Sequence, residues 1–342
     1  ALAIVFLLGF ALPALAQTPE VLYKGKDFSI TLRDLPDYDA EQGEYYEPRF
    51  YEFNDGLLPV CKWVSSIQGI RAGYIDKTGK LVIPLQYADA WDFSEGLAPV
   101  ENAAGKYGYI DAKNNVVIPH QYEDARPFSE GLARVVTGGS VKYINKKGKT
   151  VFTCKYTTAW DGDFHDGLAI VEKWSKNTAK YGFINTKGKL AISIKYQEAR
   201  EFSDGLAAVQ VNGKWGYINA EGKTVLKPQF KYAGPFKDGL APVSKDGKKW
   251  GYINKKGKFV IPAKYGRAYE FCDGLAFVKK AGDNEGASLG IIDTTGTLLV
   301  PYILGPAESF SGGLAVARNY ISYADLQDGQ SHTYLLLEKV KN

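Results

Sequence analysis

One five-residue pattern, Phe-x-acid-Gly-Leu, recurs along most of the chain and constrains its fold more than any other feature. Seven copies begin at Phe53, Phe93, Phe128, Phe164, Phe202, Phe236 and Phe271. An eighth copy begins at Phe310 and carries Gly312 in place of the acid, and successive copies start 34 to 40 residues apart. Such a fixed period is typical of solenoids, propellers and similar arrays, in which each unit covers the apolar face of its neighbour.

A second pattern, Gly-aromatic-Ile, lies between these markers and predicts a β-hairpin in each unit. It is followed by a turn such as Asp76 to Gly79, in which Asp or Asn takes the first place and Gly the fourth. The first residue caps a type I turn, and the Gly adopts a positive φ in a bulge. One unit has Asn114 in the Gly place, and Asn is the residue that best replaces Gly at positive φ.

The residues around each turn predict short strands. Tyr107 and Tyr109 alternate with Gly108 and Ile110, so the two pairs face opposite sides of a strand. A Gly inside a strand indicates that a backbone or a bulky ring packs closely there. The Leu-Ala-x-Val segment at residues 97–100 adds a third strand. No segment has a sustained helical period, and we therefore expect an all-β chain with about three strands per unit.

Composition and charge exclude several classes of protein. The 342 residues are 45% hydrophobic, which is enough to bury a core and excludes a wholly disordered chain. The formal net charge of +4 is too small to require a nucleic-acid or anionic-membrane partner. Cys61, Cys154 and Cys272 are far apart and odd in number, so neither a disulfide framework nor a zinc site is expected.

Residues 1–16 resemble a secretory signal peptide. They carry no charge and end in Ala14-Leu15-Ala16, a small-x-small cleavage pattern. The basic leader and the initiator Met are absent, so we expect a chain truncated at its start. No Cys follows the cleavage point, and no second run of 18 apolar residues is present. The sequence therefore predicts an exported mature protein with neither a lipid anchor nor a transmembrane anchor.

Two copies of the second pattern contain the pair Trp-Gly, at Trp215-Gly216 and Trp250-Gly251, and the first reads Lys-Trp-Gly-Tyr-Ile-Asn. With the repeated Phe-x-acid-Gly-Leu-Ala, the chain resembles the bacterial WG-repeat (KWG-type) family over residues 46–318. This resemblance implies an all-β, non-catalytic array, often exported or exposed at the cell surface. It implies no catalytic residue.

Two architectures fit a tandem array of seven to eight units of about 35 residues. One is an open array stacked end to end, and the other is a closed propeller of seven or eight blades. The open array is slightly favoured, because about 35 residues is short for a four-stranded blade. We expect residues 17–45 to form an N-terminal cap or extension. Residues 319–342 are expected to form a degenerate repeat or cap, whose strand at 334–337 ends the array or closes a ring.

The sequence contains no pattern of a catalytic or metal centre. His120, His165 and His332 lie in different units, and no nucleophile elbow, HExxH motif or phosphate-binding loop is present. The acid of the first pattern recurs once per unit, which indicates a loop residue that accepts local backbone hydrogen bonds. Residues 161–167 superficially resemble a calcium loop, but a two-residue insertion explains them better. We therefore expect no enzyme, no cofactor and no metal.

The position after the repeated Ala of Tyr-x-x-Ala-x varies while that Ala does not. Binding hot spots favour the aromatic and Arg residues found there. We expect these side chains to line a shared surface that contacts a glycan or a protein; the alternative is that they pack, partly exposed, on the next unit. The candidates are Trp91, Arg126, Trp160, Arg200 and Tyr269, and the remaining copies have Gly234 and Glu308.

The turn tips are rich in lysine. If the units stack in register, these lysines form a line of positive charge along one edge, and the repeated acids form a negative line elsewhere. The leading prediction is a module that binds a protein or a glycan at the bacterial envelope. The alternative is a secreted scaffold that holds an anionic polymer through the lysines, or lysines that merely keep edges apart. They are Lys77, Lys80, Lys146, Lys147, Lys149, Lys187, Lys189, Lys255, Lys256 and Lys258.

Overall fold

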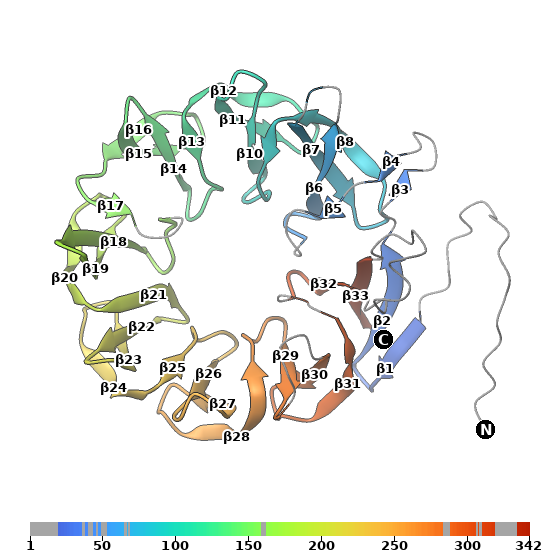
Figure 1. Cartoon of the computed structure of the whole chain (residues 1–342), viewed down its shortest axis with the longest axis vertical. Helices are drawn as coiled ribbons and strands as arrows, with labels where there is room; N and C mark the ends of the chain where they lie inside the picture. The colour runs from blue at the N-terminus through green and yellow to red at the C-terminus, as the bar shows by residue number, and fades with distance from the viewer. Residues whose placement is uncertain are drawn as a thin grey trace, which may run out of the picture.

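A computed structural model describes residues 20–35, 38–39, 44–45, 47–48, 53–64, 67, 69–158, 162–282, 288–305, 307, 310–318 and 334–342. These residues form antiparallel sheets arranged around a ring, and no α-helix occurs among them (Figure 1). The all-β repeat fold predicted from the sequence is confirmed. The signal peptide predicted at residues 1–16 lies outside the described residues.

Six of the sheets have four strands, and a seventh has seven strands because β28 belongs to two consecutive units. The ring therefore consists of eight blades. β3 (Tyr38–Asp39) and β4 (Glu44–Tyr45) form a separate two-stranded ladder. The blade strands are β5 (Glu47–Pro48), β6 (Leu57–Val64), β7 (Gly69–Asp76) and β8 (Leu81–Tyr87); β9 (Asp89–Ala90), β10 (Leu97–Glu101), β11 (Tyr107–Asp111) and β12 (Val116–Tyr122); β13 (Asp124–Ala125), β14 (Leu132–Thr137), β15 (Ser140–Asn145) and β16 (Thr150–Thr153); β17 (Thr157–Thr158), β18 (Leu168–Ser175), β19 (Thr178–Asn185) and β20 (Leu190–Tyr196); β21 (Glu198–Ser203), β22 (Leu206–Val211), β23 (Lys214–Asn219) and β24 (Thr224–Phe230); β25 (Tyr232–Ala233), β26 (Leu240–Ser244), β27 (Trp250–Asn254) and β28 (Phe259–Ala268); β29 (Leu275–Lys280), β30 (Leu289–Asp293) and β31 (Leu298–Leu304); and β32 (Leu314–Arg318), β33 (Tyr334–Lys341), β1 (Glu20–Lys24) and β2 (Phe28–Leu35).

The hairpin turns form as the sequence predicts. The amide of Gly79 donates to the carbonyl of Asp76 at 2.9 Å, and Gly79 has φ +84°. Asn114, which replaces this Gly in the next blade, has φ +66°. The Asp76 carboxylate also accepts the amides of Thr78 and Lys80 at 2.8 and 3.1 Å. The side chain that begins the turn therefore satisfies the backbone groups that the reversal leaves unpaired.

Blades have four strands rather than the three expected. The additional strand is the residue pair before the variable position, as in β9, where Ala90 pairs with Val100. Two residues are too few to show an alternating pattern, so no strand could be predicted there. In Figure 1 the first strand of a blade, such as β21, lies nearer the centre of the ring, and β20, β24 and β28 lie at its rim.

The two repeated patterns form the two sides of each contact between blades. The ring of Tyr74 in β7 packs against Phe93 of the next unit, with centroids 4.8 Å apart, and Tyr217 packs against Phe236 at the same distance. Eight apolar clusters occur among the described residues, each filled from two neighbouring blades. Each unit thus covers the apolar face of its neighbour, because a single blade cannot bury both of its own faces.

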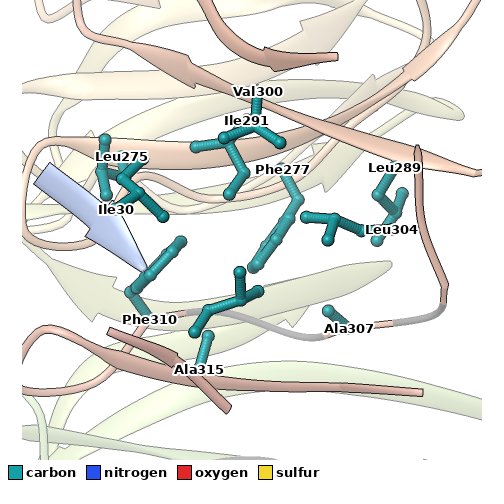
Figure 2. Packing of buried hydrophobic residues seen from close by; sticks show 11 residues of the cluster. Ile30, Leu275, Phe277, Leu289, Ile291, Val300, Leu304, Ala307, Phe310 and Ala315 are labelled. Carbon is teal, nitrogen blue, oxygen red and sulfur yellow. The ribbon is translucent and has the colours of Figure 1, made fainter. Parts of the chain in front are cut away.

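The ring closes through a blade built from both ends of the chain. Along β2 and β33, Phe28 pairs with Lys341 and Leu35 pairs with Tyr334. Ile30 of β2 is fully buried and points into the cluster that contains Phe277 and Phe310 (Figure 2). Both architectures that the sequence allowed are tandem arrays of these units, and the described sheets lie around a ring. A blade fits into about 35 residues because its first strand needs only two.

The glycine inside the third strand of a blade allows close approach of the fourth. A Cβ added to Gly216 would lie 2.5 Å from the carbonyl oxygen of Leu226 and 2.7 Å from the nitrogen of Pro228. The pairing of β23 with β24 shifts register at this point. The close backbone contact expected from the sequence is therefore present, and it lies within the blade.

Candidate functional site

A pocket of about 310 Å³ opens beside β21, the first strand of its blade. Three consecutive blades supply its lining, together with the connection from β28 to β29. Arg200, which the sequence singled out, projects from β21 into this pocket and is exposed. The other lining residues are His165, Ile170, Glu198, Ala199, Glu201, Phe202, Ser203, Trp215, Pro235, Lys237 and Glu270.

The guanidinium group of Arg200 lies over the ring of Trp215, with Cζ 5.2 Å from the ring centroid. Trp215 is almost fully buried, at 4% exposed, and belongs to the apolar cluster between two blades. A cation over an aromatic face is held electrostatically by the ring. Arg200 is thus kept in the pocket by a rigid partner, while its donors remain available to a ligand.

Two contacts between a basic side chain and a carboxylate flank Arg200. Nζ of Lys237 lies 3.2 Å from Oε2 of Glu270, and Nε2 of His165 lies 3.7 Å from Oε2 of Glu201. His165 and Lys237 occupy the second place of the Phe-x-acid-Gly-Leu pattern, where four other units have Ser94, Ser129, Ser203 and Ser311. The pocket therefore presents groups of both signs around an apolar floor.

Among the described residues, Trp91, Arg126 and Tyr269 do not line this pocket. Arg126 stacks on Trp91 of the preceding blade, with Cζ 4.1 Å from the ring centroid. Nε of Arg126 also lies 3.7 Å from the Asp124 carboxylate, which Arg134 contacts at 2.6 Å. Trp91 and Arg126 are half-buried. At these two positions the structure gives the packing of one unit on the next that was the alternative expectation.

The backbone of the variable position has a structural role in several blades. The hydroxyl of a buried tyrosine seventeen residues earlier donates to its carbonyl: Tyr74 to Trp91 at 2.6 Å, Tyr109 to Arg126 at 2.8 Å and Tyr252 to Tyr269 at 2.8 Å. Because this hydrogen bond uses the main chain, the side chain at the position is free to vary. Tyr269 is half-buried, beside the guanidinium of Arg267 at 5.9 Å.

Trp160 lies outside the described residues. Its blade contains the two-residue insertion, and there the hydroxyl of Tyr143 donates to the carbonyl of Gly162 at 2.6 Å. The structural equivalent of Trp91 in this blade is therefore Gly162. Counting forward from the repeated Ala selected Trp160, whereas counting back from Phe164 selects Gly162, and the structure follows the second alignment.

Burial keeps these tyrosine hydroxyls protonated. Loss of solvation raises the pKa of Tyr217 and of Tyr252 far above the ordinary tyrosine value. The Tyr217 hydroxyl donates to the carbonyl of Gly234 at 2.8 Å. These hydroxyl groups serve as hydrogen-bond donors to backbone carbonyls, and the two tyrosines do not line the pocket.

The sequence suggested that the repeated acids accept hydrogen bonds from their own loops. In the structure they accept hydrogen bonds from the backbone of the next blade instead. Asp55 accepts the amide of Gly96 at 2.7 Å, and Asp238 accepts that of Gly274 at 2.7 Å. All seven acids have φ between +50° and +55°. The remaining bonds join Glu95 to Gly131, Glu130 to Gly167, Asp166 to Gly205, Asp204 to Gly239 and Asp273 to Gly313.

Two of the lysines at the turn tips lie beside repeated acids instead of forming a line apart from them. Nζ of Lys146 lies 3.0 Å from the Glu95 carboxylate, and Nζ of Lys255 lies 3.9 Å from that of Asp204. Each of these lysines belongs to the blade that follows the acid. The positive potential that an anionic polymer would need is therefore partly cancelled at the tips themselves.

Of the pocket residues, the sequence identified Arg200 and missed His165, Lys237 and Glu270. A signal was present, because His165 and Lys237 are charged or titratable where most other units have Ser. It was not recognised because three adjacent blades had to be placed side by side before these positions met. Within the described residues, no group of three or more His, Cys, Asp or Glu side chains is arranged to hold a metal ion.

A ring of four-stranded antiparallel blades, each covering the next, defines a propeller-like repeat protein and a binding module in which variable side chains stand on a fixed frame. The chain belongs to the WG-repeat family, as its resemblance implied. The family described as "WG containing repeat" matches residues 73–106, 107–139, 143–176, 181–215, 215–248, 250–282 and 290–320. No curated protein matches the sequence.

Solved structures resemble this chain in fold. A eukaryotic initiation factor superposes with a TM-score of 0.55 at 11% identity, covering 90% of this chain and 90% of its own. BamB from Moraxella catarrhalis gives a TM-score of 0.46 at 12% identity, covering 84% of this chain and 95% of its own. Hsv2p from Kluyveromyces lactis gives 0.42 at 11% identity, covering 75% and 98%. The described part of the chain contains no helix long and apolar enough to cross a membrane.

Proposed function

We propose that this protein is an exported, non-catalytic binding module of the bacterial envelope, and that a glycan or protein ligand occupies the pocket around Arg200. The observation that carries the proposal is the exposed guanidinium of Arg200 held over the buried ring of Trp215. A preorganised Arg on an aromatic floor, with acids and bases around it, is the composition of a recognition site.

The pocket favours binding over a reaction. Its acids Glu201 and Glu270 each lie within 4 Å of a basic side chain, His165 or Lys237. These four residues flank the Phe of the repeated pattern: His165 and Lys237 follow it directly, and Glu201 and Glu270 precede it directly. Replacing them therefore changes the specificity of the pocket while the strands of the blades are kept. This is the way in which repeat proteins acquire different ligands.

The uncharged segment at residues 1–16 supports export. Cleavage after Ala16 would remove no part of the closing blade, because β1 begins at Glu20. Expression of the gene with its native start, followed by fractionation and mass determination of the N-terminus, tests this part. A mature chain that begins at Gln17 outside the cytosol supports export, and an uncleaved cytosolic product refutes it.

The binding part is tested with the purified full chain on arrays of bacterial glycans and of envelope-protein peptides. Arg200→Ala should weaken the binding of at least one ligand retained by the wild type at least about tenfold. Arg267→Ala is the matched control, because Arg267 also stacks on a tryptophan, with Cζ 4.5 Å from the Trp250 ring, but does not line the pocket. Equal losses in both variants, or no loss in Arg200→Ala, would refute the assignment of the pocket.

A further inference from the structure

In the described part of the ring, two hairpins are longer than five others and carry an exposed tryptophan at the same place. The strands β6 and β18 have eight residues, whereas β10, β14, β22, β26 and β29 have five or six. Trp63 and Trp174 are each the sixth residue after the leucine that begins the strand. They are 62% and 57% exposed, respectively.

The surroundings of these two tryptophans differ. Trp63 pairs across its hairpin with Ile70, which is 43% exposed, and Ile67 nearby is also exposed. Trp174 pairs with Ala179 and borders a groove of about 540 Å³ between its own hairpin and the next blade. The groove is lined by Trp174, Asn177, Thr178, Ala179, Lys180, Tyr181, Gln197, Glu198, Ala199 and Gln210.

The indole ring of Trp174 is held by one edge. Its Nε1 donates to Oε1 of Glu172 at 2.8 Å. A hydrogen bond along the edge leaves the face of the ring available for stacking. The exposed indole ring is therefore oriented by Glu172, which lies two residues away on the same strand.

Side chains with amide and hydroxyl groups line the same groove as the indole ring of Trp174. Oε1 of Gln197 accepts the amide of Gly213 at 2.8 Å, which fixes this side chain and leaves its NH₂ group to donate elsewhere. Asn177 and Thr178 are exposed at the tip of the hairpin, and Gln210 is half-buried. These groups donate and accept hydrogen bonds without carrying charge.

The groove and its hairpin tip favour neither a charged ligand nor a membrane. Glu172 and Glu198 both lie beside Tyr181, whose pKa is raised by burial and by these two carboxylates. The lining of the groove contains one base and one acid, Lys180 and Glu198, so it carries no net charge that would select an anionic ligand. The hairpin tip from Ser175 to Thr178 is exposed and polar, so it lacks the apolar residues that enter a bilayer interface.

We propose that the groove beside Trp174 is a second binding site, for an uncharged saccharide whose ring stacks on the indole while its hydroxyls bond to Gln197, Asn177 and Thr178. A sugar ring presents an apolar face of C–H groups and a rim of hydroxyls, which this arrangement complements. The site is distinct from the Arg200 pocket, because the two share only Glu198 and Ala199 of β21.

The test uses the purified full chain and an array of neutral oligosaccharides (N-acetylglucosamine, glucose and mannose oligomers) together with acidic ones. We expect the wild type to retain at least one neutral oligosaccharide, with an affinity insensitive to salt. Trp174→Ala should lower this affinity at least about tenfold, since a stacked aromatic ring contributes strongly to binding. Trp63→Ala is the matched control and should leave it unchanged.

Three outcomes would overturn the proposal: no neutral oligosaccharide retained by the wild type, retention only of acidic glycans, or equal losses in Trp174→Ala and Trp63→Ala. Binding of the wild type to phosphatidylglycerol vesicles that is lost in both tryptophan variants would likewise replace the sugar by a lipid surface. Arg200→Ala separates this proposal from the proposed function, because it should leave neutral-saccharide binding at Trp174 intact. Circular dichroism of all variants confirms that they are folded.

Discussion

The carboxylate of Asp204 accepts the backbone amide of Gly239 at 2.7 Å, and this bond joins one blade to the next. Asp204 has φ +54°, so the backbone adopts a left-handed conformation to aim the side chain across the blade boundary. The same bond recurs from blade to blade at the other repeated acids. It adds a polar connection to the apolar contact between blades.

Asp204→Ala should destabilise the protein by about 1–2 kcal/mol, because it removes a charge-assisted hydrogen bond and places Ala at a positive φ. Urea unfolding measures the change in the free energy of unfolding. Asp204→Asn keeps an acceptor and tolerates this φ, so its loss should be smaller. Equal losses in the two variants would show that the charge near Lys255, and not the bond to Gly239, stabilises this boundary.

The boundary between the eighth unit and the first lacks this acid. Gly312 stands in its place, with φ +57°, and a Cβ added there would meet nothing within 4 Å. Gly312→Asp should supply the missing acceptor for the amide of Gly56 and stabilise the ring by about 1 kcal/mol. Thermal unfolding measures this change.

Gly312→Ala is the control for this prediction. It introduces the same backbone strain without a carboxylate, so it should lower the melting temperature. If Gly312→Asp lowers the melting temperature as much as Gly312→Ala does, Gly56 does not gain the bond and the boundaries of the ring are not equivalent.

Gly216→Ala should destabilise the protein by about 2–4 kcal/mol, because the new methyl group would lie 2.5 Å from a backbone oxygen of β24 and a strand must move. Gly69→Ala is the control, since its nearest neighbours lie 3.7 Å away. Chemical denaturation compares the two variants. A Gly216→Ala variant as stable as Gly69→Ala would show that the blade yields easily at this point.

Tyr217→Phe should cost about 1–2 kcal/mol at neutral pH, because the carbonyl of Gly234 loses its donor. Another blade already has Phe183 at this place, so the ring itself fits. Melting temperatures at pH 7 measure the loss. No change would indicate that water replaces the hydroxyl.

The pH dependence of the same variant has a definite sign. Burial raises the pKa of Tyr217, so the folded chain keeps its proton above pH 10, while an unfolded tyrosine ionises near pH 10. Stability is therefore full below about pH 10 and falls as the pH rises further. Tyr217→Phe should show a shallower loss between pH 10 and 11.5, and an unchanged slope would assign the alkaline loss to other tyrosines.

The sequence predicted those parts of the fold that depend on neighbouring residues. The turns at Gly79 and Asn114 follow from positive φ, and the alternation around Tyr109 follows from strand geometry, so both were found. The two-residue strand at Ala90 has no period to detect. The pairing of Phe28 with Lys341 joins the ends of the chain and leaves no local pattern.

The candidate site was predicted only in part, for a related reason. Arg200 was found because its position varies beside a constant Ala. Trp174 was missed because it lies on an extension that most units lack, so alignment of the repeats leaves it without counterparts. Trp160 was selected because the repeats were aligned on the Ala, which lies before a two-residue insertion in this unit. Gly162 holds the equivalent backbone position.

The blade shared by the two ends also sets the order in which the molecule can be completed. Strand β2 is synthesised long before its partner β33, so the strands at residues 20–35 remain without this ladder until β33 has been made. Pairing over such a separation is slow, and exposed strand edges favour aggregation meanwhile. A circular permutation that fuses residues 20–35 after residue 342 should therefore let the strands of this blade form in succession and speed refolding.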